Sequence, residues 1–254
     1  MRRIVPIVVA SVVATRWAPA SAAIIPAAAG AFGIPTRVAS PNGVLLTFDD
    51  GPHPQGTPAV LEALGRAGAH AVFFVSGEQA ERHPALVRRV VEVGHEIGVH
   101  GYRHQSRRQW TRRLVREDIL RALDAISAAT GTEPTLYRPP HGTFSRPGLK
   151  IVEELDLTPL LWSKWGRDWQ GRATPDSIVR RTTNGLVAGD VILLHDADHY
   201  GALGNWTKTA AAIDPIVEVI RSVGLETVRW SRDLRPTKKG AAAEAPSSRR
   251  LILR

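Results

Sequence analysis

The strongest constraint on the fold is a regular alternation between short apolar runs and segments with helical periodicity. From residue 43 onward, about seven runs rich in Val, Ile, Leu and Phe are typical of strands. They cover residues 44–48, 70–77, 95–100, 135–138, 158–163, 190–195 and 225–230. Most of these runs are apolar throughout, which predicts strands covered on both faces, as in a parallel sheet.

The segments between these runs repeat apolar residues every three or four positions, which predicts amphipathic helices. The expected helices cover residues 58–68, 84–94, 111–131, 147–156, 174–189 and 205–224. Two begin with a Thr-Pro pair, in which Thr57 and Thr174 are candidate N-caps. Alternating strands and helices fit either a closed parallel barrel or an open doubly wound sheet. In both layouts, the catalytic groups lie beyond the carboxyl ends of the strands.

The two ends of the chain differ from this pattern. Residues 1–22 combine Arg2 and Arg3, a short apolar run and small residues at Ala20 and Ala22, the layout of a secretory signal. We therefore expect a secreted or cell-surface protein. Residues 23–42 are predicted to form a linker, and the Pro-, Ala- and Ser-rich residues 235–254 a disordered basic tail. Residues 43–234 remain for a single catalytic domain.

Composition excludes several functions. The chain has no cysteine, so it has no disulfide, thiolate metal site or thiol nucleophile. Its 33 Lys and Arg residues against 24 Asp and Glu residues give a formal charge of +9. The arginines are scattered over the expected helices and are not interleaved with aromatic residues, so we expect no nucleic-acid binding. Weak association with an anionic cell wall fits this charge, and we expect a monomer.

Polar side chains follow most of the predicted strands at the point where each strand ends. In a parallel α/β protein these ends converge on one face, so the side chains should share one pocket. In chain order they are Asp49, Asp50, His100, His104, Arg138, His141, Asp168, Trp169 and His195.

The segment "HGYRH" and the adjacent aspartates suggest a metal site. His100 and His104 are four residues apart, a spacing that can hold one ion. Two histidines and one aspartate form a common ligand set for a catalytic divalent cation. Such a cation would explain why Asp49 and Asp50 stand side by side. One aspartate would bind the metal, and the other would stay free to take a proton from the attacking water.

Five segments together resemble the NodB-like polysaccharide deacetylases, the fourth carbohydrate esterase family. They are "TFDDGP", "HGYRH", "RPPHG", "RDW" and "LLH", in this order, and the resemblance covers residues 45–230. It implies a distorted (β/α) barrel with about seven parallel strands. It also implies hydrolytic removal of N-acetyl groups from GlcNAc-containing poly- or oligosaccharides, such as chitin oligomers or peptidoglycan, with release of acetate.

The resemblance assigns roles around the metal. Asp49 would be the general base, and Arg138 would orient it and support its charge. Asp50, His100 and His104 would bind the divalent metal, which in this family is usually zinc.

The resemblance also assigns the groups that act on the substrate. His195 would be the general acid, held in its tautomer by Asp168. The backbone N–H of His141 would help to stabilise the oxyanion. Leu193 would line the pocket for the acetyl methyl group, and Trp169 would form a wall of the substrate groove.

Three residues depart from the family pattern. Gly101 stands where a Ser or Thr usually supports the loop geometry, and His141 stands where an aromatic residue is usual. Trp165 stands where an Asp often precedes the Asp-Trp pair by three residues. These changes bear on loop stiffness, substrate fit and the shape of the groove.

Three rival functions remain open on the sequence alone. The same machinery could serve an acetylxylan-type O-acetyl esterase. A catalytically silent carbohydrate-binding protein, or a basic protein that binds anionic polymers, would need no reaction centre. The complete set of acid, base and ligand residues favours the deacetylase.

Overall fold

A single parallel sheet forms the centre of the protein, for which the computed structural model describes residues 18–23, 25–105 and 111–236. The strand order is β5-β4-β3-β2-β1-β7-β6, and β8 pairs with the start of β1. The described strands all pair in parallel. The strands are β1 (Gly43–Asp49), β2 (Ala71–Val75), β3 (Glu96–Val99), β4 (Leu136–Tyr137), β5 (Thr158–Pro159), β6 (Lys164–Trp165), β7 (Val191–His195) and β8 (Glu226–Thr227).

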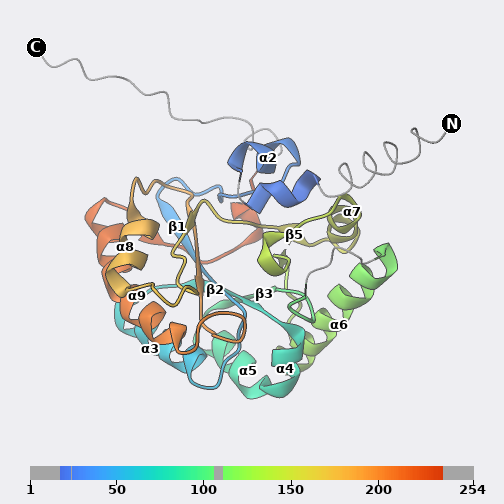
Figure 1. The fold of residues 1–254 in the computed structure, drawn as a ribbon, viewed down its shortest axis with the longest axis horizontal. Helices are drawn as coiled ribbons and strands as arrows, with labels where there is room; N and C mark the ends of the chain where they lie inside the picture. Colours follow the sequence, from blue (N-terminus) through green and yellow to red (C-terminus); the bar gives the residue numbers. More distant parts are fainter. Residues whose placement is uncertain (1–17, 24, 106–110, 237–254) are drawn as a thin grey trace, which may run out of the picture.

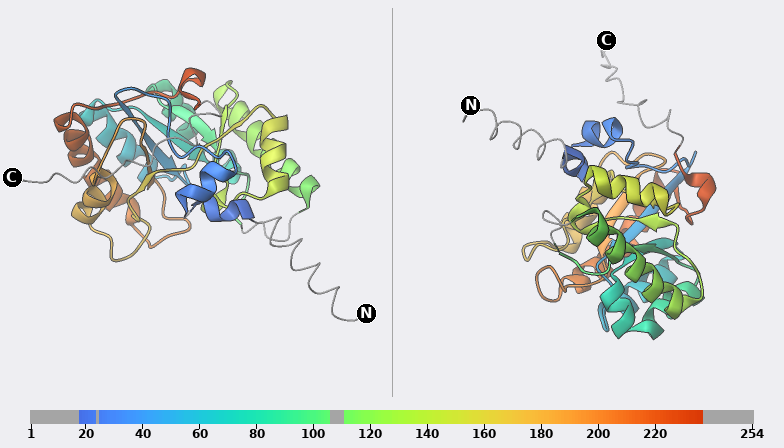
Figure 2. Two further views of the ribbon diagram at one scale, coloured as in Figure 1. Left: turned by 90° about the horizontal axis from the view of Figure 1, so that it is seen from above. Right: turned by 90° about the vertical axis from the view of Figure 1, so that its right-hand side faces the viewer.

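The helices lie outside the curled sheet (Figures 1 and 2). They are α2 (Pro26–Ala31), α3 (Gly56–Ala67), α4 (Gly77–Arg82), α5 (Pro84–Glu92), α6 (Arg112–Thr130), α7 (Arg146–Glu154), α8 (Pro175–Thr183) and α9 (Asn205–Ser222). Three short 3-10 helices complete the fold: η1 (Ala18–Ala23), η2 (Pro140–Gly142) and η3 (Arg232–Leu234). Seven parallel strands thus curl into a half-barrel, which confirms the predicted distorted barrel.

The period of two along β1 separates two hydrophobic cores. Leu46 and Phe48 belong to the large core between the sheet and the surrounding helices. Leu45 belongs to a smaller core with Val72 and Phe74 of the neighbouring strand β2. The residues that follow Leu45 at this spacing are polar. The apolar layer inside the half-barrel therefore gives way to a polar one toward the carboxyl end of β1.

Strand β6 and helix α4 were not expected from the sequence. The run predicted over residues 158–163 contains the two-residue strand β5, and β6 follows just beyond it and pairs with β7 through Lys164 and Trp165. Helix α4 follows β2 directly and has only six residues. Elements this short carry too little periodicity to be recognised. Both elements adjoin loops at the carboxyl ends of the strands.

Much of the segment predicted as a linker, residues 23–42, packs against the domain. Ile34 and Val38 are buried, and the carbonyl of Pro35 accepts the N–H of Leu161. Val38 also donates its backbone N–H to the Gly189 carbonyl. The linker expectation is therefore corrected for this part of the chain. Its Pro, Ala and Gly content resembles a linker, but its few large apolar residues fill the side of the half-barrel.

The predicted ends of the chain lie mainly outside the described residues. This applies to residues 1–17 of the expected signal and to residues 237–254 of the expected tail. Within the described ranges, none of the helices combines the length and apolarity needed to cross a membrane.

Candidate active site

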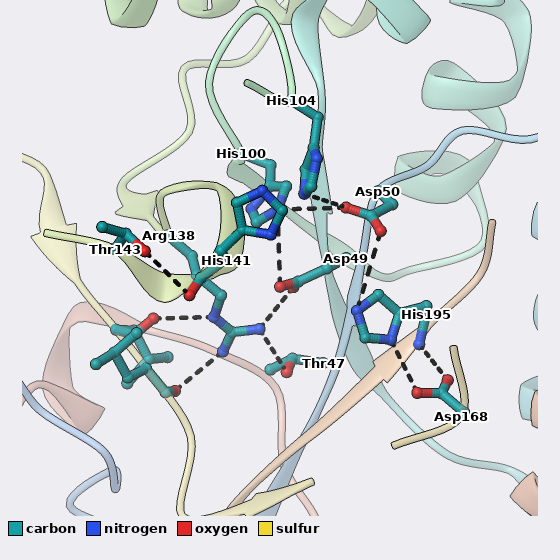
Figure 3. A network of polar contacts seen from close by, with 12 residues as sticks. Thr47, Asp49, Asp50, His100, His104, Arg138, His141, Thr143, Asp168 and His195 are labelled. Atoms are coloured by element: carbon teal, nitrogen blue, oxygen red, sulfur yellow. Dashed lines mark hydrogen bonds and ion pairs between the residues drawn. The ribbon is translucent and has the colours of Figure 1, made fainter. Parts of the chain in front are cut away.

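The site begins at a sharp turn after β1. Asp49 is the last residue of the strand, and Asp50 adopts a left-handed backbone conformation with φ of 80°. This conformation is uncommon for residues other than glycine, although aspartate tolerates it better than most. Figure 3 shows the carboxylate of Asp49 directed to Arg138 and that of Asp50 to His104 and His195, while both lie near His100. Each carboxylate therefore has cationic or polar partners that offset the repulsion expected between the two.

Asp49 is held by a fully buried arginine. Arg138, which follows β4, has no exposed surface and donates from Nη1 to Asp49 Oδ1 at 2.6 Å. The same guanidinium donates to Thr47 Oγ1 and to the carbonyls of Leu160 and Leu161. A buried charge is tolerated only when it is paired and hydrogen-bonded, and Arg138 meets both conditions. The carboxylate of Asp49 is thereby fixed in orientation.

Asp50 faces the two histidines. Its Oδ1 atom lies 3.4 Å from His100 Nε2 and 3.3 Å from His104 Nε2. Ligands of a tetrahedral zinc ion, at the usual bond lengths, are about 3.4 Å apart. Asp50 Oδ1 is also buried without a hydrogen-bond partner among the described residues. Asp50, His100 and His104 therefore fit a divalent cation held between them.

The protonation states of this group suit metal binding. Burial lowers the pKa of His104 to about 3, so its imidazole is neutral near pH 7. Burial alone would raise the pKa of Asp50, but the imidazoles of His100, His195 and His104 that face its carboxylate hold that pKa well below its usual value. An ionised carboxylate and neutral imidazoles are the forms that bind metal.

The loop that carries His100 and His104 is fixed without the hydroxyl that the family usually has. Gly101 has φ of 81°, a left-handed conformation that would strain Ser or Thr. Its carbonyl accepts the N–H of Gly77 at the start of α4. Asp118 of α6 accepts the N–H groups of Tyr102 and Arg103. The sequence left open whether this loop is rigid without a Ser or Thr hydroxyl. In the structure, hydrogen bonds with α4 and α6 hold it in place.

His195 forms a second polar group on the neighbouring strand. Its Nδ1 lies 2.8 Å from Asp168 Oδ1, and its backbone N–H donates to Asp168 Oδ2 at 2.7 Å. Thr209 also donates to Asp168 Oδ2. Because Asp168 accepts at Nδ1, the Nε2 atom of His195 is the one that faces the site, 4.0 Å from Asp50 Oδ2. Burial opposes the charged imidazole, but the charge and hydrogen bond of Asp168 raise the pKa of His195 to about 10.

Two further predicted residues, His141 and Trp169, contact this centre, and Leu193 lies near it on β7. His141 lies on η2 with φ of 58°, and its ring centroid is 4.4 Å from that of His104. The half-buried Trp169 packs its ring edge against His195, with 5.3 Å between centroids. Leu193 is buried in β7, two residues before His195. The structure therefore brings all the predicted site residues to one end of the half-barrel.

One aromatic residue at the site was not predicted from the sequence. Tyr200, in the loop after β7, stacks on His104 with 4.0 Å between ring centroids and donates its hydroxyl to Glu78. It covers one face of a candidate metal ligand. Its position in an irregular loop, outside any recognisable motif, left no signal from which this contact could be predicted.

A second group of possible ligands, His53, Asp198 and His199, lies nearby but is explained by hydrogen bonding. His53 Nδ1 accepts the N–H of Gly56 at 2.9 Å, so the ring proton is on Nε2. That proton points to Asp198 Oδ1 at 3.2 Å. Burial also lowers the pKa of His53, which favours this neutral form. The Nε2 lone pair that a metal would need is absent in this arrangement.

Comparison with known proteins agrees with this geometry. A family profile described as "Polysaccharide deacetylase" matches residues 37–160. The chitooligosaccharide deacetylase of Sinorhizobium fredii is 34% identical over 197 residues, covering 75% of this chain and 91% of that protein. The solved structure of a family 4 carbohydrate esterase from Streptomyces lividans, in complex with acetate, superposes with a TM-score of 0.69 at 32% identity. It covers 78% of this chain and 97% of that one.

A longer relative shows the same match over part of its length. The peptidoglycan-N-acetylglucosamine deacetylase PgdA of Listeria monocytogenes is 33% identical over 185 residues. The match covers 73% of this chain but only 37% of that protein. With the fold and the gathered site residues, these matches identify the chain as a member of the polysaccharide deacetylase family, the NodB-like carbohydrate esterases of family 4.

The different partners of Asp49 and Asp50 predict that the two aspartates contribute unequally to zinc binding. Replacing Asp50 by Asn should weaken zinc binding by more than ~100-fold, because it removes a ligand charge rather than a supporting contact. Replacing Asp49 by Asn should leave the affinity within about tenfold of the wild type, because that carboxylate is engaged by Arg138. Isothermal titration of the metal-free variants with Zn²⁺ measures both. The reverse ranking of the two variants would show that the aspartates have been assigned the wrong way round.

Proposed function

We propose that this protein is a metal-dependent deacetylase that removes N-acetyl groups from GlcNAc-containing glycans and releases acetate. The observation that carries the proposal is the register of two neighbouring strands. Asp49 of β1 and His195 of β7 are direct Cα partners. Candidate base and candidate acid therefore stand side by side, with the ligand group of Asp50, His100 and His104 next to both.

The position of the Asp49 carboxylate supports its role as the general base. One of its oxygens is occupied by Arg138, and the other, Oδ2, lies 3.9 Å from His100 Nε2. The free oxygen is therefore beside the ligand group, where it can accept a proton from the attacking water. A divalent cation bound at the ligand group would polarise the acetamide carbonyl and lower the pKa of water.

The position and the pKa of the His195 imidazole support its role as the general acid. Its Nε2 faces Asp50 across 4.0 Å, while Asp168 fixes the opposite side of the ring. With its pKa raised to about 10, the imidazole is protonated near pH 7 and can donate a proton to the departing amine nitrogen. The left-handed backbone at His141 is consistent with a strained position that presents its N–H to the developing oxyanion.

The relatives narrow the substrate to acetylated glycans. One acts, by its name, on chitooligosaccharides and the other on peptidoglycan N-acetylglucosamine. Their common group is N-acetylglucosamine, which we take as the acetyl donor here. Trp169 would form the wall for a sugar ring, and Leu193 would contact the acetyl methyl group. We further propose zinc as the metal and export, by the predicted N-terminal signal, to the cell wall.

Acetate release tests this proposal. Incubation with a chitin tetramer or with peptidoglycan should release acetate and expose free amines. Treatment with a chelator should stop the reaction, and Zn²⁺ should restore it, because the ligand group needs a cation to act. Mass spectrometry of the glycan detects the loss of each acetyl group. Release from acetylated xylan alone would indicate an esterase, and glycan binding without turnover would indicate a silent binding protein.

The pH profile tests the pairing of Asp168 with His195. The acid must be protonated, so activity falls as the pH rises through its pKa. Replacing Asp168 by Asn removes the charge that stabilises the imidazolium and should lower that pKa by about 1–3 units. The basic limb of the kcat/KM profile should then move to lower pH by the same amount. Replacing the exposed Asp124 by Asn is the matched control and should leave the limb in place. An unmoved limb in the Asp168 variant would contradict the assignment.

A further inference from the structure

A basic hollow lies at the edge of the sheet, beside the candidate active site. It has a volume of about 430 Å³ and lies between the edge strand β6 and helix α8. Its lining includes four cationic residues and one aromatic ring: Lys164, Trp165, Arg167, Arg180 and Arg181. None of these residues was assigned a role in the reaction described above.

The positive charge of this hollow is not neutralised by the protein. Among the described residues, no carboxylate lies within ion-pair distance of Arg167, Arg180 or Arg181. Other surface arginines do have such partners: Arg113, for example, pairs with Glu117. The Lys164 ammonium donates hydrogen bonds to the carbonyls of Asn184 and Gly185. These neutral acceptors do not cancel its charge.

A helix end explains only part of this arrangement. Arg180 and Arg181 are in the last turn of α8, where cations interact favourably with the helix dipole, and Asp176 is in the first turn. The dipole does not account for Arg167, which comes from the loop after β6. Its backbone is left-handed with φ of 52°, and its guanidinium lies 4.5 Å from the ring centroid of Trp165. A strained backbone that directs a third cation to the same hollow points to a ligand.

A row of rings connects the hollow to the reaction centre. The ring centroids of Trp165 and Trp169 are 5.5 Å apart, and those of Trp169 and His195 are 5.3 Å apart. Trp165 therefore lines the hollow while its neighbour contacts the candidate general acid. A glycan whose reacting sugar lies beside His195 would bring the adjacent sugar or its substituent to Trp165.

We propose that this hollow binds a carboxylate carried by the glycan substrate, next to the sugar that is deacetylated. The paired N–H donors of an arginine guanidinium match the two oxygens of a carboxylate. The indole face of Trp165 offers a surface for the sugar ring that bears the carboxylate. The inference rests on the proposed deacetylase function and adds a preference to it. The enzyme favours acidic glycans, such as those with lactyl ether carboxylates, over neutral chitin oligomers.

The test compares two forms of one substrate. A tetrasaccharide of alternating N-acetylglucosamine and N-acetylmuramic acid is used with its lactyl carboxylates free or converted to methyl amides. The double variant Arg180→Gln, Arg181→Gln should lower kcat/KM for the acidic form by about fivefold, through KM, because two exposed ion pairs are lost. Deacetylation of the amide form should change little. Raising the salt concentration should reduce the wild-type preference for the acidic form.

A matched pair of arginines controls for net charge. Arg88→Gln with Arg89→Gln removes the same charge from α5, a helix that does not line the hollow. This variant should keep the wild-type ratio between acidic and amide substrates. An unchanged ratio in the Arg180 and Arg181 variant, or an equal loss in the α5 variant, would overturn the proposal. If the wild type deacetylates neither form while it binds zinc, the proposed function fails instead.

Discussion

The ion pair between Arg138 and Asp49 is the interaction on which the site depends. One guanidinium in the interior of the half-barrel links β1 with the residues after β4 and with two carbonyls after β5. Breaking this pair would leave a buried charge without compensation, which costs about 3–5 kcal/mol. The pair also determines which of the two adjacent aspartates faces the histidines. Because Asp49 is committed to Arg138, Asp50 is the aspartate available to His100 and His104.

Parallel register then brings the remaining groups to the same place. Asp49 of β1 is aligned with His195 of the neighbouring strand β7. Strand β3 ends one residue before His100. Strand β6 ends three residues before Asp168, which holds His195 through both its ring and its backbone. No single segment contains the site. It exists only because several strands of one parallel sheet end at the same edge.

The sequence predicted the fold class and the gathering of the site, since both depend on strong local patterns. It could not predict details decided by tertiary contacts. The two Thr-Pro pairs show this clearly. Thr174 caps α8 as expected, and a capping box is formed with Ser177. Thr57 lies inside α3 instead, because its hydroxyl donates to the buried carboxyl of Asp196 and accepts the N–H of His53.

The remaining differences have similar causes. The left-handed turn at Asp50 and the stacking of Tyr200 on His104 depend on residues distant in sequence. Strand β6 has two residues, too few for a periodic signal, yet it carries Trp165 to the edge of the basic hollow. The packed part of residues 23–42 was mistaken for a linker because a few apolar residues, such as Ile34, do the packing. Motifs thus identify the reactive groups, while loops and short elements shape the surface around them.

The most direct test of the account is the position of zinc in a crystal of the protein, located by anomalous scattering at the zinc edge. The account predicts one strong peak within bonding distance of Asp50, His100 and His104, with Asp49 uncoordinated and still paired with Arg138. A peak bound to Asp49, or one that lies only among His53, Asp198 and His199, would contradict it.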